Sequence, residues 1–154
     1  MNEKLIFRLA NLADLPSIVR MLADDDLGSQ RERFVEPLLD SYIRAFEKIE
    51  KDPNHELVAA ELDGEIVGTL HLTFIPSISY QGGLRALVES VRVDRKYRGQ
   101  GIGTEMMRWV INRAREREAY LLQLTTHRSR KDAHRFYERL GFNGSHLGMK
   151  LNLR

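Results

Sequence analysis

The clearest chemical pattern in the chain is a glycine-spaced turn between an expected strand and an expected helix. It reads R-x-x-G-x-G and comprises Arg98, Gly99, Gln100, Gly101, Ile102 and Gly103. Because glycine has no side chain, backbone N–H groups in such a turn can close on an anion, and the new helix adds the positive end of its dipole. The pattern therefore predicts a pyrophosphate cradle. A tight strand-to-helix turn that needs only positive φ at Gly99 or Gly101 would explain the same glycines.

Length and composition narrow the classes of protein that the chain can belong to. Its 154 residues, 42% hydrophobic and 30% charged, suit one globular domain over residues 1–154. There is no apolar run of about 18 residues, and the start of the chain is unlike a secretory signal, so we expect a cytoplasmic protein without a membrane span. The Rossmann and P-loop glycine spacings are also missing, which argues against those two nucleotide-binding classes.

The reactive residue types exclude further kinds of site. There is no cysteine, hence no disulfide, no thiolate metal site and no cysteine nucleophile. The five histidines are scattered without metal-ligand spacing, so we predict no metal. A net charge of +2 is too weak to indicate nucleic acid as a partner.

Hydrophobic periodicity predicts the elements that place the turn. In the first half we expect a strand at Leu5–Leu9, a helix capped by Asp14, a helix over Arg31–Lys51, and a hairpin of Leu57–Leu62 and Glu65–Phe74 about an Asp63-Gly64 turn. The second half predicts a loop at Ile75–Gly83, a long strand at Leu84–Val93, a helix over Gly103–Glu118, a parallel strand at Leu121–Thr125, a helix over Arg130–Leu140 capped by Gly141, and a last strand from the alternation of Leu147, Met149, Leu151 and Leu153.

A second motif, read with the turn, points to a family. The segment from Asp132 to Phe142 reads DAHRFYERLGF and follows the turn after one helix and one strand. This combination resembles the GNAT superfamily of acyl-CoA-dependent N-acetyltransferases. The resemblance implies an α/β fold with a mixed sheet of about six to seven strands, splayed at the cofactor site and flanked by about four helices. The habit of the family also suggests a homodimer, with the final strand as the expected contact.

The resemblance implies acetyl-CoA as cosubstrate. Its pyrophosphate would meet N–H groups of the turn and of Thr104, with Arg98 adding positive charge. Its pantetheine arm would pair with main-chain groups of the long strand, which the splay leaves without a strand partner. The remaining expected contacts are Val91, Arg92, Val93, Thr126, Lys131, Ala133 and Phe136. Thr126 or His127 stands where many members have an asparagine.

The resemblance also implies two catalytic side chains. Tyr137 matches the usual general acid, a phenol that protonates the departing thiolate. Glu89 lies two residues before Val91 on the same face of the long strand, so it points to where the acetyl end and the incoming amine should meet. It would accept the proton of the amine, directly or through water, or attract a cationic substrate. The N–H of Val91 or of a neighbour would polarise the carbonyl. The alternatives are a packed aromatic for Tyr137 and a surface acid paired with Arg85 or Arg92 for Glu89.

The predicted function is transfer of an acetyl group from acetyl-CoA to a primary amine of a small molecule, by direct attack in a ternary complex. The segment around Leu124 to Tyr137 is also similar to aminoalkylphosphonate N-acetyltransferases, which favours small amines, although the metal ligands of those enzymes are not evident. The alternatives are a protein N-terminal or lysine acetyltransferase and a non-catalytic acyl-CoA sensor. The acidic run at residues 24–26 suggests either a cationic acceptor or a solvated loop.

Overall fold

The computed structural model describes residues 4–154, which form two compact units that divide between Gln123 and Leu124. We call residues 4–123 the sheet unit and residues 124–154 the C-terminal unit, and describe each by itself. A single domain over the whole chain stays a prediction. None of the helices in the described part of the chain is long and apolar enough to cross a membrane.

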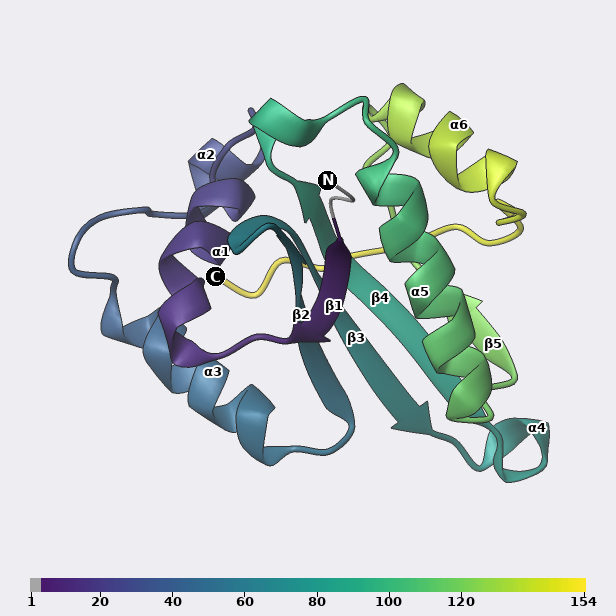
Figure 1. Ribbon diagram of the computed structural model, residues 1–154. Coiled ribbons are helices and arrows are strands. Elements are labelled where there is room, and N and C mark those ends of the chain that lie inside the picture. Colours follow the sequence, from purple (N-terminus) through teal and green to yellow (C-terminus); the bar gives the residue numbers. More distant parts are fainter. Residues whose placement is uncertain (1–3) are drawn as a thin grey trace. The chain divides into compact units, whose positions relative to one another are not determined.

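The sheet unit is built on five strands in the order β1-β2-β3-β4-β5 (Figure 1). The strands are β1 (Leu5–Leu9), β2 (His55–Leu62), β3 (Glu65–Pro76), β4 (Leu84–Val93) and β5 (Leu121–Gln123). The first four pair antiparallel, and β5 joins β4 in parallel. A crossover helix connects β4 to β5, as a parallel pair requires. This is the mixed α/β sheet that the resemblance implied.

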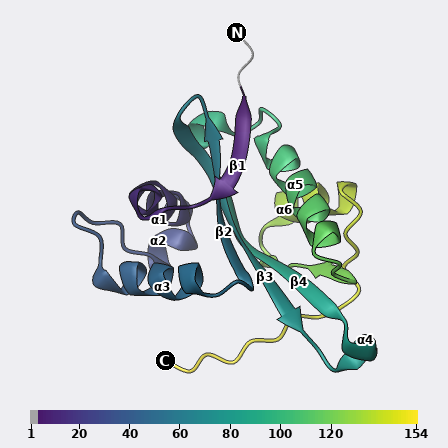
Figure 2. The same ribbon diagram turned by 60° about the horizontal axis from the view of Figure 1, so that its bottom comes forward.

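Helices cover both faces of this sheet. The longer ones are α1 (Leu15–Leu22), α3 (Asp40–Lys51) and α5 (Ile102–Glu116); the short ones are η1 (Leu12–Asp14), α2 (Gly28–Arg31), α4 (Ser79–Gly82) and η2 (Arg95–Tyr97). Figure 2 shows α1 and α3 on one face of the sheet and α5 on the other. The buried core therefore has two layers, with Val19 and Phe46 on the first face and Met106 and Val110 on the second.

Two predicted elements are corrected by the structure. The helix expected over Arg31–Lys51 begins only at Asp40, and residues 32–39 are irregular. The helical spacing of apolar residues extends into that segment, but Pro37 has no N–H and blocks the preceding turn, so the helix cannot run through it.

The last strand expected from Leu147 to Leu153 is also absent, since residues 147–154 have no strand partner in the described chain and those apolar side chains are exposed. Alternation shows which side chains share a face, but a strand exists only where a neighbour completes its ladder. The described sheet therefore has five strands, not six to seven.

The C-terminal unit contains a single helix, α6 (Lys131–Arg139), among its described elements. Gly141, with φ +96°, follows the helix in the left-handed conformation that ends helices, as predicted. The DAHRFYERLGF motif is thus helical from its first residue to Arg139.

The close approach of α5 to the sheet depends on Gly68 of β3. A Cβ there would lie 2.7 Å from Sδ of Met106 and 3.1 Å from the carbonyl oxygen of Arg92. A larger side chain fits only if the Met106 thioether shifts and the backbone of β4 at Arg92 gives by a few tenths of an ångström.

We therefore expect Gly68→Ala to lower the free energy of unfolding by about 1–3 kcal/mol, the usual cost of overpacking a core. Urea unfolding measures the change. Gly144→Ala is the control, because no atom lies within 4 Å of its added Cβ, and its effect should stay within about 0.5 kcal/mol. Equal stability of the two variants would show that α5 does not need the glycine.

Candidate functional site

The site is organised by an irregularity in β4. Register pairs Glu89 with His71 and Arg92 with Thr69, so two residues of β4, Ser90 and Val91, lie opposite one residue of β3, Leu70. The backbone of Ser90 accommodates the extra residue by adopting the left-handed conformation, at φ +54°. This is a β-bulge, which bends its strand and re-aims neighbouring side chains.

The bulge also changes which side chains of β4 share a face. The prediction that Glu89 and Val91 do so assumed strict alternation, which the bulge removes. Opposite residues of an antiparallel pair lie on one face, so the register instead puts Glu89 and Arg92 on the face of His71 and Thr69. That face carries α1 and α3. Glu89 itself is exposed.

β4 and β5 pair over only part of β4. The parallel register joins Arg85, Ala86 and Leu87 to β5 and stops there. Within the described residues, the rest of β4 up to Val93 has no strand on that side. The carbonyl oxygen of Val91 accepts from Nη1 of Arg92 at 2.9 Å, and that of Val93 accepts from Nε of Arg98 at 3.1 Å. Each carbonyl has a second lone pair, so the edge keeps the capacity to pair with an extended ligand.

The glycine turn has the open backbone that the pattern predicted. Gly99 and Gly101 adopt φ +76° and +85°, and no atom lies within 4 Å of a Cβ added to either. Gly101 is the N-cap of α5, without a side-chain cap bond. Because the first N–H groups of a helix have no partner within it, those of Ile102, Gly103 and Thr104 are not bonded inside α5 and can donate to a ligand at this turn. Gln100, in contrast, turns its side-chain amide to the carbonyl of Lys96.

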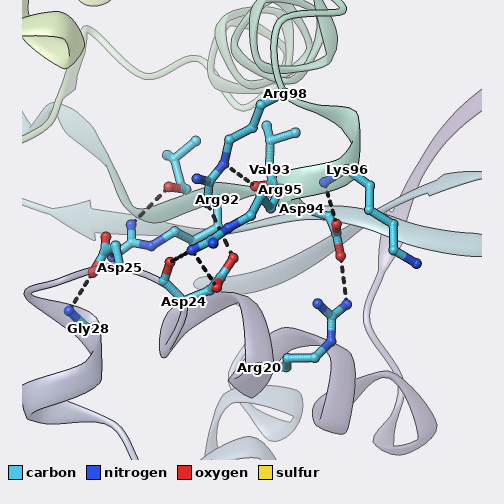
Figure 3. Close-up of polar contacts among 11 residues, drawn as sticks. Arg20, Asp24, Asp25, Gly28, Arg92, Val93, Asp94, Arg95, Lys96 and Arg98 are labelled. Carbon is cyan, nitrogen blue, oxygen red and sulfur yellow. Dashed lines mark hydrogen bonds and ion pairs between the residues drawn. The ribbon is translucent and has the colours of Figure 1, made fainter.

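Acidic residues at the end of α1 hold the arginines of β4 and the turn (Figure 3). Asp24 Oδ1 lies 3.0 Å from Nη2 of Arg95, and its Oδ2 lies 3.7 Å from Nη2 of Arg98. Asp25 Oδ2 lies 3.7 Å from Nη2 of Arg92, and its Oδ1 accepts from the N–H of Gly28. Asp24 and Asp25 are thus neither a solvated loop nor a free acceptor site; they neutralise cations of the candidate site.

Asp94 anchors the start of the turn. It is buried, its Oδ2 lies 2.7 Å from Nη2 of Arg20 on α1, and its Oδ1 accepts from the N–H of Lys96 at 2.9 Å. Burial acts to raise the pKa of Asp94, but the hydrogen bonds from Arg20 and Lys96 outweigh it and hold that pKa below its ordinary value. Neither Asp94 nor Arg20 was a predicted site residue.

The other predicted residues lie in the C-terminal unit. Thr126 precedes α6, and its Oγ1 is buried and has no hydrogen-bond partner among the described residues. Lys131, Ala133, Phe136 and Tyr137 all lie on α6. The Tyr137 ring is half-buried and makes edge contacts with Phe136 and Phe142. Glu89 and Tyr137 belong to different units, so their approach to one reacting centre stays a prediction.

Two histidines of the sheet unit lie next to each other, which the sequence did not predict. Nδ1 of His55 lies 2.9 Å from Nε2 of His71, and Nε2 of His55 lies 3.7 Å from Oδ2 of Asp52. The Asp63-Gly64 turn alone could not have found them, because the register that it sets is shifted at Ala60 and Glu61 before the strands reach the two histidines.

The paired state of Asp94 gives stability a defined pH dependence. A lowered native pKa contributes stability that is complete above the unfolded value, near 3.9, and is lost as pH falls through the native value. Asp94→Asn should therefore be less stable than wild type at pH 7, and the difference should narrow below about pH 4.

Urea unfolding at pH 7, 5 and 3.5 measures this difference. Asp26→Asn is the matched control, because Asp26 is exposed and its carboxylate makes no ion pair in the described chain. A difference for Asp94→Asn that does not depend on pH would contradict the assigned role.

Comparison with known proteins places this geometry in a family. A family model described as acetyltransferase (GNAT) family matches residues 21–142. Aminoalkylphosphonate N-acetyltransferase of Salmonella typhimurium is 39% identical over 99 residues, which cover 62% of each protein. Glucosamine 6-phosphate N-acetyltransferase of Trypanosoma brucei brucei is 32% identical over 90 residues, covering 58% of this chain and 59% of that protein. The matches thus span about three fifths of these curated relatives.

A solved structure is similar over nearly the whole chain. It is described as a transcriptional regulator from Bacillus halodurans C-125, is 51% identical, has a TM-score of 0.94, and aligns with 97% of this chain and 100% of its own. The match to the family model over residues 21–142, which include β4, the glycine turn and α6, shows that the chain belongs to the GNAT family of acetyltransferases.

Proposed function

We propose that this protein transfers an acetyl group from acetyl-CoA to a primary amine of a small molecule, by direct attack in a ternary complex. The observation that carries the proposal is the open turn at Gly99 and Gly101, which begins α5 directly beside the part of β4 that lacks a partner on its β5 side. An anion at the turn and an extended chain along β4 would belong to one continuous ligand. Acetyl-CoA has both parts, a diphosphate and an amide-bearing arm.

The residues that would hold acetyl-CoA fit its chemistry. N–H groups from Gln100 to Thr104 would donate to the diphosphate, and Arg98 would add charge by exchanging its 3.7 Å ion pair with Asp24 for a phosphate oxygen. Main-chain groups of Val91 to Val93 would pair with the pantetheine amides. The Oγ1 of Thr126, with Lys131, Ala133 and Phe136, would complete the contacts from the C-terminal unit.

Acetyl-CoA, when bound, would supply a thioester as acetyl donor. The N–H of Val91 would polarise its carbonyl. The amine nitrogen forms the new bond to the carbonyl carbon, the carbon–sulfur bond breaks, and the proton that the amine loses passes to a base beside the site, directly or through water. Tyr137 would donate its phenolic proton to the departing sulfur. Glu89, exposed beside His71 on the face of α1 and α3, would attract the ammonium form of the acceptor.

The relatives support a small acceptor. The names of the Salmonella and Trypanosoma proteins describe acetylation of an aminoalkylphosphonate and of glucosamine 6-phosphate, both small amines. Acetylation of a protein N-terminus or a lysine is the alternative within the same chemistry. The solved relative described as a transcriptional regulator favours a second candidate function, an acyl-CoA sensor without turnover.

Coenzyme A binding tests the glycine turn. We expect Gly101→Ala to raise the Kd for coenzyme A at least about tenfold, equivalent to about 1.4 kcal/mol, because a side chain there strains the turn and enters the cradle. Gly64→Ala is the control, since Gly64 has nearly the same φ, +84°, and the same open surroundings but lies in the β2–β3 hairpin. Isothermal titration calorimetry should find the Kd of Gly64→Ala close to wild type; equal weakening in both variants would refute the cradle.

Turnover tests Tyr137 and separates enzyme from sensor. Release of coenzyme A is measured with small amines and with peptides as acceptors. Tyr137→Phe should lower kcat about a hundredfold with little change in coenzyme A affinity, because it removes the proton donor and keeps the ring. Tyr120→Phe controls for loss of a phenol elsewhere. Unchanged kcat in Tyr137→Phe would remove Tyr137 from the mechanism, and coenzyme A binding without turnover of any acceptor would favour the sensor.

A further inference from the structure

A cavity of about 140 Å³ lies between α1, α3 and the sheet. Apolar side chains of the two helices form most of its wall, and the polar residues on it are Tyr42, Thr69, His71 and Ser90. No lysine, arginine, aspartate or glutamate of the described chain lines it. The cavity is therefore suited to an apolar body and offers no charge to hold a phosphate or phosphonate.

Two of the polar side chains on this wall are already engaged. The Tyr42 hydroxyl donates to Oε2 of Glu32 at 2.9 Å, and the Thr69 hydroxyl donates to the carbonyl oxygen of Val58 at 2.9 Å. Nδ1 of His71 and the hydroxyl of Ser90 make no hydrogen bond with any described residue. Polar groups that face a cavity without an internal partner are the ones that can orient a ligand.

The cavity reaches the bulge of β4. Ser90 lines it and is also exposed, so this wall opens to the surface where β4 is irregular. Ser90 immediately precedes Val91, whose N–H is proposed to polarise the acetyl carbonyl. An amine seated in the cavity would thus have its nitrogen close to the acetyl group, provided that the proposed function, on which this inference rests, is correct.

His71 is the end of a chain of titratable groups that leads to solvent. The half-exposed carboxylate of Asp52 favours the proton of His55 on Nε2, which makes Nδ1 of His55 an acceptor. That acceptor, 2.9 Å away, draws the proton of His71 to Nε2. The neutral tautomer assigned by this network leaves Nδ1 of His71 as an unprotonated lone pair.

The surroundings of His71 keep it neutral. Burial and the nearby His55 both lower its pKa from the ordinary value of 6.5. Across from it on β4, Glu89 is the nearest charged group by register and is exposed, so its influence is screened by solvent. The helices add only apolar side chains and the Tyr42 phenol to the cavity, while Asp52 acts through His55.

We propose that His71 is the catalytic base for the acceptor amine, and that the acceptor is a primary amine with an apolar body seated in the α1–α3 cavity. Nδ1 of His71 takes the proton of the amine, and the proton on Nε2 passes to Nδ1 of His55. His55 then releases its own Nε2 proton toward Asp52 and water, which leaves both rings with a proton on Nδ1. Each ring must exchange that proton for one on Nε2 before the next turnover. His55 is a positioning residue in this chain, because it acts through His71.

Rates against pH separate His71 from Glu89. We compare kcat/KM for 2-phenylethylamine, n-butylamine and 2-aminoethylphosphonate in wild type, His71→Gln, His55→Gln and Glu89→Gln. Wild type should use the two apolar amines at least about tenfold better than the phosphonate. His71→Gln should lose about a hundredfold in kcat/KM and the acidic limb of the profile, because glutamine keeps the donor to His55 but takes up no proton.

The two other variants test which residues belong to the proposed path of proton transfer. Glu89→Gln should keep the acidic limb and change mainly KM, whereas His55→Gln should shift the limb without removing it. An unchanged profile in His71→Gln, or loss of the limb in Glu89→Gln alone, overturns the inference and leaves the proposed function standing. Preference for the phosphonate overturns the apolar acceptor. If wild type binds acetyl-CoA but acetylates no amine, the proposed function fails, and the inference with it.

NMR of the wild-type protein gives a test that needs no variant to fold. With nitrogen-15 in its histidines, His71 should appear at pH 7 as the neutral Nε2–H tautomer, and should titrate below pH 6.5. A neutral Nδ1–H tautomer, or a protonated ring at pH 7, would overturn the role of Nδ1 as base.

Discussion

The site depends on one constraint, which is that β4 is held by β3 along its length and by β5 only at its beginning. Pairing with β5 ends at Leu87, while pairing with β3 continues to Val93 through the bulge at Ser90. Apart from the bulge at Ser90, the second half of β4 is thereby held in an extended conformation, and no strand of the described chain lies on its β5 side. Because buried backbone N–H and C=O groups need hydrogen-bond partners, this half of β4 is a preformed edge with which a ligand can pair. The glycine turn follows this edge directly in the chain.

Ion pairs connect this edge of β4 to the face of the sheet that α1 covers. The end of α1 supplies Asp24 and Asp25 to the arginines of β4 and the turn, and Arg20 holds the buried Asp94. The turn is therefore positioned by α1, although the two are far apart in sequence. The 3.7 Å contact of Arg98 with Asp24 is long and exposed, so it costs little to exchange for a phosphate. The short contacts of Asp94 and Arg95 keep the backbone in place while that exchange occurs.

The sequence predicted the parts of the site that are local in the chain. The bounds of β4 and the positive φ at Gly99 and Gly101 follow from alternation and glycine spacing, which need no knowledge of the rest of the fold. The prediction that the helix includes residues 32–39 was wrong, because it relied on the helical spacing of apolar residues and gave too little weight to Pro37. The prediction of a last strand was wrong, because alternation of apolar residues does not show whether a neighbouring strand is present to pair with it. The ion pair of Asp24 and Arg98 arises from a tertiary contact, and the pair of His55 and His71 arises from strand register. Neither is contained in a local sequence pattern.

A crystal structure of the protein with acetyl-CoA tests the central claim most directly. The diphosphate should accept hydrogen bonds from N–H groups between Gln100 and Thr104, and the pantetheine arm should lie along β4 from Val91 to Val93. The acetyl group should then lie beside Ser90, with the Tyr137 hydroxyl directed at the sulfur. A turn without the diphosphate, or an arm that runs away from β4, would contradict the account.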